Sequence, residues 1–299
     1  MTTAPVQPPP EVSGPPDPQL FRIRDLIYES AGIFHPDNKL RLLSDRCSRR
    51  MKEIKALDLQ EYFERLTSNP QRQAEMVALL NEITIGETCF FRNRTQLDAL
   101  TRIVIPKILA AKTKLPRNCL RIWSAGCSTG EEPYTISMLL LEESGARLKN
   151  WTIEILATDL NEHSLEHAKK AVYGDYSTRH LPQHYRLKHF TPAGNELQVQ
   201  PAVRARVNFS RLNLSEDARM NLMKNFDIIF CSNVLIYFDL ASKRRVIQHF
   251  HQSLLPHGYL FMGHSESLFG VSDDFRLVHL PQAIGYVKAE RNPAGKQGA

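Results

Sequence analysis

The apolar positions of the chain follow two different periods, and the change falls near residue 118. Before that point apolar side chains recur at spacings of three and four, as in Leu20, Ile23 and Ile27, which predicts amphipathic helices. One helix begins at Asp17-Pro18 and ends at Gly32, where a cap residue and a stop residue frame it. Three more helices are expected over about 37–56, after Asp58 and in "QAEMVALLNEI". We therefore expect a small helical bundle.

After residue 118, short apolar runs alternate with segments long enough for helices. The runs are "LRIWSA", "WTIEILATD", "FDIIFCS" and "GYLFMGH", and the helical segments are 131–142, 161–172 and 239–254. This alternation predicts an α/β fold with a doubly wound, mostly parallel sheet covered on both faces. "FRLVHL" and "AIGYVK", joined by Pro281-Gln282, predict an antiparallel hairpin at the C-terminal end.

These patterns divide the chain into five parts. We expect a disordered Pro-rich tail (1–18), an N-terminal helical domain (19–84), a linker with one further helix (85–118), an α/β domain (119–290) and a tail (291–299). The polar, turn-rich text at about 175–207 interrupts the α/β alternation, so we expect a small β insertion there.

Composition narrows the class of protein. The 299 residues are 42% hydrophobic and 23% charged, as in an ordinary soluble globular protein, and no apolar run is long enough to span a bilayer. The N-terminus lacks the pattern of a signal peptide. The five cysteines form no CxxC pair, so we expect neither a disulfide framework nor a metal site, and we expect a cytoplasmic protein. The net charge of +6 fits an acidic partner without identifying one.

Polar residues follow the predicted strands at the edge where a doubly wound sheet binds its ligand. "SAGCSTG" follows the first strand, Asp159 ends the second, and Ser232-Asn233 follow "FDIIFCS". The glycines allow close approach of the backbone to a ligand. A phosphate at the following helix would be repelled by Glu131 and Glu132.

S-Adenosylmethionine suits this edge better than a dinucleotide, because it carries an ammonium and a sulfonium group but no phosphate. Glu131 or Glu132 would balance the ammonium group, and Asp159 would bind the ribose hydroxyls. The alternative is that the two glutamates only complement the dipole of the helix that they begin.

Six motifs resemble those of the CheR-type chemotaxis receptor methyltransferases, over about residues 19–288. They are "ETCFFRN", "RIWSAGCSTGEEPY", "ILATDLN", "NFSRLNL", "FDIIFCSNVLIYF" and "GYLFMGHSES", and they occur in the family's order. The resemblance implies a helical domain before a methyltransferase domain with a small β insertion. It also implies transfer of a methyl group from S-adenosyl-L-methionine to glutamate side chains of chemoreceptors, with S-adenosyl-L-homocysteine as product.

The resemblance also implies the site residues. The helix after the linker motif covers the cofactor, Asp159 binds the ribose, Asn213 and Leu214 flank the adenine, and Arg92 and Tyr237 lie at the transfer site as catalytic residues. The cofactor-binding set is Gly86, Thr88, Arg92, Gly126, Glu132, Asp159, Asn213, Leu214, Ser232 and Asn233, with no metal. Two positions depart from the family pattern: Gly86 replaces an asparagine, and Ser232 replaces an arginine.

The chemistry needs no general base, because a glutamate carboxylate is already ionised at pH 7. Arg92 can grip and orient that carboxylate; alternatively it forms a surface salt bridge with Glu87 or Asp98. Tyr237 alternatively serves packing alone. His264 lacks a partner nucleophile nearby in the sequence, and we interpret it as structural.

The second helix carries a cluster of basic residues: Arg46, Arg49, Arg50 and Lys52. It is either a solvated face or a docking surface for the acidic cytoplasmic region of a receptor. Two other functions compete with receptor methylation: methylation of another protein or RNA, and a non-catalytic signalling module that binds cofactor. We expect no nucleic-acid partner, no membrane insertion and a monomer.

Overall fold

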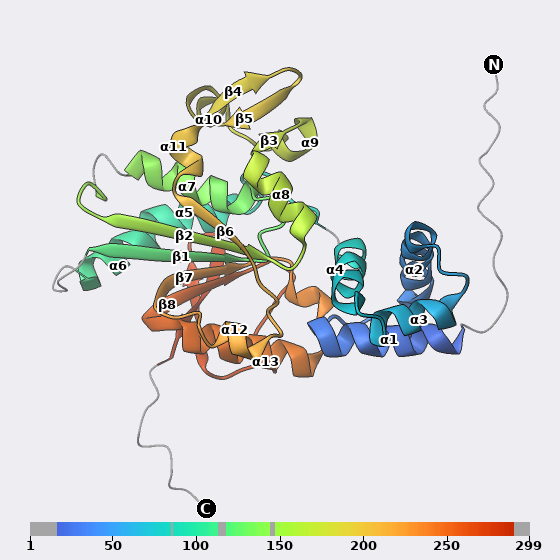
Figure 1. The fold of residues 1–299 in the computed structure, drawn as a ribbon. Coiled ribbons are helices and arrows are strands. Elements are labelled where there is room, and N and C mark those ends of the chain that lie inside the picture. The colour runs from blue at the N-terminus through green and yellow to red at the C-terminus, as the bar shows by residue number, and fades with distance from the viewer. Residues whose placement is uncertain (1–16, 85, 113–117, 144–146, 290–299) are drawn as a thin grey trace, which may run out of the picture.

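The computed structural model describes residues 17–84, 86–112, 118–143 and 147–289. Most of the predicted Pro-rich tail and the whole of 291–299 lie outside these residues. The described chain forms a group of helices beside a larger α/β unit (Figure 1). No helix in the described ranges is long and apolar enough to cross a membrane.

Four helices form the N-terminal unit, as the periodicity predicts. They are α1 (Pro18–Ala31), α2 (Leu40–Ile54), α3 (Leu59–Thr67) and α4 (Arg72–Ile83), and a short 3-10 turn, η1 (Asp37–Lys39), precedes α2. Asp17 accepts a hydrogen bond from the N–H of Gln19, and Asp58 accepts one from the N–H of Glu61, both at 2.8 Å. Gly32 ends α1 with φ 69°. The predicted caps and stop are therefore confirmed.

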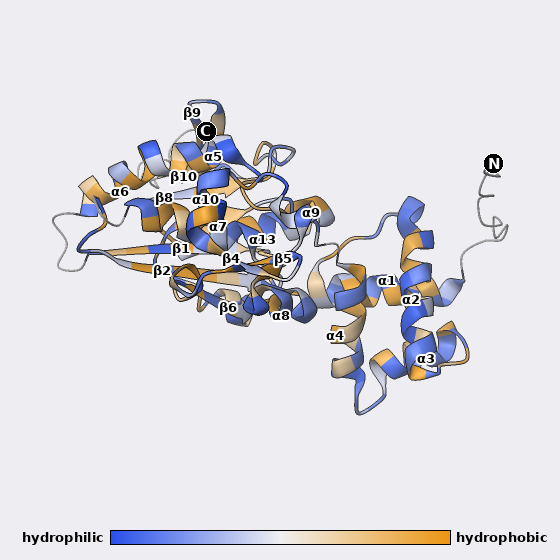
Figure 2. Cartoon of the chain, turned by 90° about the horizontal axis from the view of Figure 1, so that it is seen from above, coloured by the Kyte–Doolittle hydropathy of each residue, from blue (hydrophilic) through white to orange (hydrophobic). Residues whose placement is uncertain are grey.

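The helices of this unit carry apolar and polar segments side by side (Figure 2). Their apolar faces meet in one core that includes Ile23, Ile27, Leu43 and Leu79. Burial of such amphipathic faces, rather than helix propensity, supplies most of the stability of short helices.

The α/β unit is built on a seven-stranded sheet in the order β6-β2-β1-β7-β8-β10-β9. The strands are β1 (Cys119–Ala125), β2 (Thr152–Asp159), β6 (Val207–Arg211), β7 (Phe226–Cys231), β8 (Leu254–Met262), β9 (Phe275–Leu280) and β10 (Ala283–Lys288). β6, β2, β1, β7 and β8 are mutually parallel, whereas β10 runs antiparallel to β8 and to β9. The predicted fold class and the C-terminal hairpin are confirmed.

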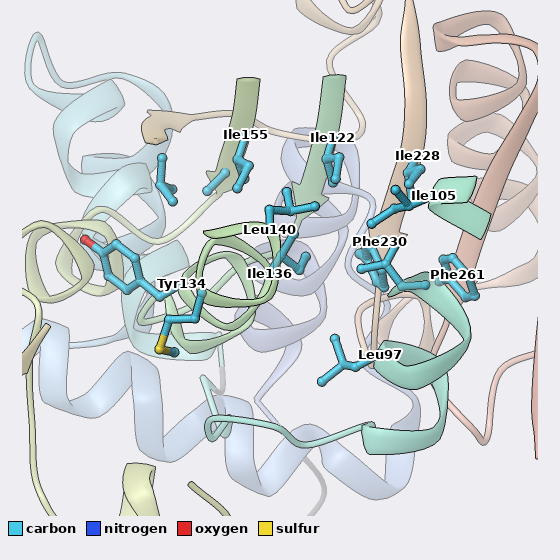
Figure 3. Close-up of a cluster of buried hydrophobic side chains, with 14 of the residues drawn as sticks. Leu97, Ile105, Ile122, Tyr134, Ile136, Leu140, Ile155, Ile228, Phe230 and Phe261 are labelled. Carbon is cyan, nitrogen blue, oxygen red and sulfur yellow. The ribbon is translucent and has the colours of Figure 1, made fainter. Parts of the chain in front are cut away.

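Alternate residues of the central strands enter two cores, one on each face of the sheet. Ile122 of β1 and Ile228 of β7 pack against α7 (Glu131–Glu143) and its neighbours, as Figure 3 shows. The next residue of β1, Trp123, packs on the other face against α13 (Leu240–Ser253). This alternation follows from the period of two in a strand, and double burial explains the nearly continuous apolar runs.

The linker continues into a helical segment made of α5 (Arg94–Ala99), the π-turn η2 (Leu100–Val104) and α6 (Ile105–Lys112). Leu97, Leu100 and Val104 enter the same core as α7. The segment thus belongs to the packing of the sheet, and its first turns also reach the cavity described below.

The insertion is more elaborate than the predicted β element. It holds a three-stranded antiparallel sheet of β3 (Val172–Tyr173), β5 (Glu196–Val199) and β4 (Phe190–Ala193), which starts before residue 175. Three short helices accompany it: α9 (Asp175–Thr178), α10 (Gln183–His189) and α11 (Pro201–Arg204). The β4–β5 ribbon confirms the predicted β character. The short helices, and edge strand β6 of the main sheet, escaped the periodicity argument because each spans only a few residues.

The two units are joined by hydrogen bonds at the ends of α1 and α4. The side-chain amide of Asn213 donates to the carbonyl of Ser30 at 2.6 Å, and that of Asn161 donates to the carbonyl of Asn81 at 3.0 Å. An isolated antiparallel bridge pairs Ile33 with Phe238. The helical unit is thereby fixed at the carboxyl edge of the sheet.

Candidate active site

A cavity of about 330 Å³ lies where the helical unit, the linker and the carboxyl ends of the parallel strands meet. Strand order reverses between β1 and β7, so the cavity occupies the switch point of the doubly wound sheet. All of the predicted cofactor-binding and catalytic residues line it: Gly86, Thr88, Arg92, Gly126, Glu132, Asp159, Asn213, Leu214, Ser232, Asn233 and Tyr237. The structure therefore brings together residues that are far apart in the sequence.

The turn after β1 has a backbone that side chains would obstruct. Gly126 and Gly130 have φ of 74° and 92°, a region that glycine enters without strain. A Cβ on Gly126 would lie 2.3 Å from Cγ2 of Val234, and one on Gly130 would lie 2.8 Å from Cβ of Ala168. The N–H of Gly126 donates to the carbonyl of Thr158 at 2.8 Å. The turn is therefore held close to β2 and to the segment after β7.

Glu131 and Glu132 take different positions, although they are neighbours in the first turn of α7. Glu132 lines the cavity, and its Oε1 accepts a hydrogen bond from the Ser124 hydroxyl at 2.7 Å. Glu131 is 1% exposed, does not line the cavity and accepts from the hydroxyl of Thr129 at 2.6 Å. The structure thus selects Glu132 as the carboxylate that can meet a cation.

Burial dominates the electrostatics of the two cavity carboxylates. It raises the pKa of Glu132, against the opposing effects of the Ser124 hydroxyl and of the Arg92 charge. Burial also raises the pKa of Asp159, against the N–H groups of Asn161 and Ser128. A cationic ligand would relieve the cost of keeping these groups ionised away from water.

Asp159 is oriented by backbone donors at the end of β2. Its Oδ2 accepts from the N–H of Ser128 at 2.7 Å, and its Oδ1 accepts from the N–H of Asn161 at 2.8 Å. A carboxylate offers about four lone-pair positions, so each oxygen keeps capacity for a ligand hydroxyl. The position suits a ribose.

The linker motif places Arg92 at the cavity on a strained turn. Phe91, the preceding residue, has φ 57°, which is costly for a bulky residue and characteristic of functional sites. The Arg92 Nη1 donates to the carbonyl of Glu87 at 2.9 Å. The Glu87 carboxylate pairs instead with Arg179, at 3.9 Å, so the predicted alternative of a salt bridge between Arg92 and Glu87 or Asp98 is not observed within the described ranges.

Gly86 packs against the turn after β1. The Ser128 hydroxyl donates to the carbonyl of Gly86 at 3.0 Å, and a Cβ on Gly86 would lie 2.6 Å from that hydroxyl oxygen. The glycine at this departure from the family pattern lets the linker approach the turn closely.

Glu266, which was not predicted as a site residue, fixes the backbone that follows β7 at the cavity. Its carboxylate accepts from the N–H groups of Asn233, Leu235 and Gly263 at 2.7, 2.8 and 2.8 Å. Asn233 has φ 61°, so these bonds hold it in a conformation that few residues adopt. The signal was present in the motif "GHSES", where His264, which is exposed and does not line the cavity, draws attention first.

Tyr237 packs against the hydrophobic cores and also lines the cavity. It lies at the end of the 3-10 turn η3 (Leu235–Tyr237), packs against both the helical core and the sheet core, and also lines the cavity. Burial raises its pKa, so the phenol stays protonated at neutral pH and can donate a hydrogen bond.

Of the four predicted docking residues, Arg50 is turned into the helical unit. Its guanidinium donates to both oxygens of Glu75, at 3.1 and 2.8 Å, and its side chain is 13% exposed. Tyr62 donates to the same carboxylate at 3.0 Å. The docking prediction for Arg50 conflicts with these contacts, because the residue is part of an internal network and not of the surface.

The other three basic residues lie at the surface of α2. Arg46 and Arg49 approach Glu82 only at 3.9 and 3.8 Å, and Lys52 is exposed. Both arginines thus form long ion pairs with Glu82, and their side chains are 24% and 61% exposed, so Lys52 and Arg49 are open to an acidic partner and Arg46 is partly so.

Among the described residues, no group of three or more His, Cys, Asp or Glu is arranged to hold a metal ion. The cysteines at 47, 89, 119, 127 and 231 are all free.

Comparisons with known proteins agree with the fold and the cavity. The family model described as "CheR methyltransferase, SAM binding domain" matches residues 86–284, and the model described as "CheR methyltransferase, all-alpha domain" matches residues 18–84. The fold and site therefore define an S-adenosylmethionine-dependent methyltransferase. More particularly, the chain belongs to the CheR methyltransferase family.

Several curated relatives match nearly end to end. "Chemotaxis protein methyltransferase 2" of Vibrio cholerae is 33% identical over 94% of this chain and 96% of its own length. "Chemotaxis protein methyltransferase Cher2" of Pseudomonas putida is 35% identical over 90% and 97%, and the "Chemotaxis protein methyltransferase" of Escherichia coli is 32% identical over 87% and 88%. Among solved structures, the match to the magnesium protoporphyrin IX methyltransferase of Synechocystis covers 81% of this chain and 95% of that chain, at 12% identity and a TM-score of 0.34.

The residues of the cavity fit the cofactor of this family. A half-buried carboxylate, Glu132, suits the ammonium group, Asp159 keeps acceptor capacity for ribose hydroxyls, and buried Leu214 offers an apolar surface for adenine. S-Adenosylmethionine is the cofactor of this enzyme.

Proposed function

We propose that this protein transfers the methyl group of S-adenosylmethionine to glutamate side chains in the cytoplasmic region of chemoreceptors, and that it acts in the cytoplasm. The observation that carries the proposal is the convergence of Glu132, Asp159 and Arg92 on one cavity at the switch point of the sheet. The family match and the names of the relatives supply the substrate class.

We assign the cofactor side of the cavity to residues at the strand ends and the linker. Glu132 pairs with the ammonium group, Asp159 binds the ribose, and Asn213 and Leu214 flank the adenine. At Gly86, Thr88 and Gly126 the backbone can approach the cofactor closely. Ser232 and Asn233 form the floor of the cavity.

The transfer side orients a carboxylate that is already ionised. When bound, the cofactor supplies an electrophilic methyl group on a sulfonium. A glutamate oxygen of the substrate forms a bond to that methyl carbon as the carbon–sulfur bond breaks, and the electron pair of the broken bond remains on sulfur, leaving S-adenosylhomocysteine. Arg92 and the protonated phenol of Tyr237 hold the carboxylate in line and exclude water, so positioning replaces acid–base catalysis.

Docking of the receptor is assigned to the exposed part of α2. Arg46, Arg49 and Lys52 present positive charge to an acidic receptor surface, whereas Arg50 stabilises the unit from within. Because exposed charges are screened by salt, receptor affinity should fall as ionic strength rises.

Incubation of the protein with methyl-labelled cofactor and receptor-containing membranes tests the proposal. Base-labile label on receptor protein is the expected result, since carboxyl methyl esters hydrolyse in base. Label on RNA or on another protein would show that the substrate is not a chemoreceptor. Cofactor binding without methyl transfer to receptor, RNA or any other protein would contradict the proposed catalysis.

A further inference from the structure

Three large apolar side chains stay exposed around the mouth of the cavity. Phe34, Leu42 and Ile236 are 44%, 41% and 46% exposed, and all three line the cavity. They come from the connection after α1, from α2 and from η3. We name these three residues the apolar rim. Other exposed apolar residues of the described chain, such as Leu57, Leu187 and Leu222, do not line the cavity.

The rim is fixed beside the candidate transfer residue. The N–H of Phe34 donates to the carbonyl of Tyr237 at 2.9 Å, and the adjacent Ile33 forms the bridge to Phe238. The ring of Phe34 packs edge-on against Tyr28, with centroids 6.3 Å apart. Ile236 directly precedes Tyr237 on the same turn. An apolar group that binds here would therefore sit close to the point of methyl transfer.

The rim continues into positive charge along α2. Arg46 and Arg49 follow Leu42 at four and seven residues, so the three share one helical face. Lys39, three residues before Leu42, is exposed and also lines the cavity. From Lys39 to Arg49 this stripe spans about 15 Å, the length of roughly three helical turns.

The charge and shape of this surface determine what fits it. A straight stripe of basic residues with one apolar position matches an acidic amphipathic helix, whose side chains repeat at the same three- and four-residue spacing. Single exposed apolar residues are common on any protein surface, whereas a cluster of them at a cavity mouth marks a binding surface. RNA would satisfy the charges but would leave the aliphatic Leu42 and Ile236 without an apolar partner.

We propose that the apolar rim selects substrates by binding an apolar side chain one helical turn from the glutamate to be methylated, on an acidic amphipathic helix of the receptor. The proposal rests on the proposed function and adds a selection rule to it. Phe34 and Ile236 hold the apolar side chain beside Tyr237, while Arg46 and Arg49 align the acidic face of the helix.

Substitution of the rim tests the rule from the enzyme side. Ile236→Ser, Leu42→Ser and Phe34→Ser should each raise KM for a receptor cytoplasmic fragment about tenfold, the value expected when one half-exposed side chain loses its burial. The dissociation constant of S-adenosylhomocysteine should stay unchanged. Leu222→Ser, at an 80% exposed leucine away from the cavity, is the matched control and should leave both constants unchanged. The thermal unfolding midpoint of each variant identifies any variant that fails to fold. The KM values of the variants that do fold then test the proposal.

Substitution of the receptor tests the same rule from the substrate side. Replacing the apolar residues one turn from a methylated glutamate by serine should raise KM about tenfold with the native enzyme and little with Ile236→Ser, because the two changes remove the same contact. Equal increases with both enzymes, or no effect of any rim variant, would overturn the proposal. Absence of base-labile label with the native enzyme would instead refute the proposed function.

Discussion

The two sides of the cavity are built from different materials. On the cofactor side, backbone N–H groups and tight glycine contacts fix the half-buried carboxylates, as at Asp159 and Gly126. On the substrate side, exposed side chains from the helical unit and η3, such as Phe34, Leu42 and Arg49, face outward. The cofactor is the same in every reaction, so a rigid site can bind it. A protein substrate must enter and leave, and exposed side chains on a rigid backbone allow this.

This contrast predicts that the largest loss comes from the residue between the two sides. Arg92→Ala should lower kcat by about 10²- to 10³-fold, the usual effect of removing one preorganised charged donor from a reacting centre. The dissociation constant of S-adenosylhomocysteine should change by a much smaller factor. Methyl transfer under saturating cofactor, together with calorimetric titration of the product, measures both. Arg94→Ala, two residues away at an exposed position outside the cavity lining, is the control. A selective loss of cofactor binding would move Arg92 to the cofactor side.

A second variant tests whether the backbone after β7, which Glu266 holds in place, is needed for methyl transfer. Glu266→Ala removes the acceptor of three backbone N–H groups and leaves Asn233 free to abandon its left-handed conformation. We expect kcat to fall about thirtyfold, which corresponds to about 2 kcal/mol for buried donors left without their acceptor, with a smaller change in the receptor KM. Glu266→Gln, which keeps one acceptor oxygen, should recover part of kcat. Native kcat in Glu266→Gln would show that the side chain merely fills space, because glutamine keeps the volume but loses the charge and one acceptor oxygen.

Protonation of the cavity carboxylates should weaken the binding of S-adenosylmethionine. Burial raises the pKa of Glu132 and of Asp159; a raised carboxyl pKa means that the ionised form becomes scarce as pH falls through that value. A cationic ligand needs the ionised form, so affinity for S-adenosylmethionine should drop by up to tenfold per pH unit below the raised pKa. Glu132→Gln should bind weakly at every pH and show a flatter profile. If the affinity of the native protein for S-adenosylmethionine rose as the pH fell, this predicted pH dependence would be contradicted.

The smallest expected effects separate two arginines on α2. Arg50→Met leaves the Glu75 carboxylate without its cationic partner and should lower the free energy of unfolding by about 3 kcal/mol, while receptor KM changes little. Arg49→Ser should leave stability nearly unchanged, raise receptor KM severalfold and flatten its dependence on salt. Denaturant unfolding and transfer assays at two ionic strengths distinguish them. Identical behaviour of the two variants would contradict the division between internal and docking residues.

The sequence predicts most of the fold because both hydrophobic periods are strong and the helix caps are local. Asp17, Gly32 and Asp58 act within a few residues of their own position, so pattern alone finds them. The short helices of the insertion, β3 and β6 were missed or left vague, because two to seven residues give too few repeats for a period to be recognised.

The site was predictable where it depends on strand ends and unpredictable where it depends on rotation or distant contacts. Glu131 and Glu132 differ only by one step around a helix, and their neighbours decide which faces the cavity. Glu266 lies in the motif "GHSES", but its contact with a loop 33 residues away cannot be read from that motif. Arg50 did carry a signal, since it lies three residues after buried Cys47 and seven after buried Leu43, on the apolar face of α2.

The central claim is that carboxylates on the cofactor side hold a cationic nucleoside without phosphate. Calorimetric titration of S-adenosylmethionine and of 5′-methylthioadenosine, which lacks the amino-acid end, into the native protein and Glu132→Gln tests it directly. The account predicts that the substitution weakens S-adenosylmethionine about tenfold to a hundredfold and leaves 5′-methylthioadenosine unchanged. Equal weakening of both ligands, or tight binding of ATP in their place, would contradict it.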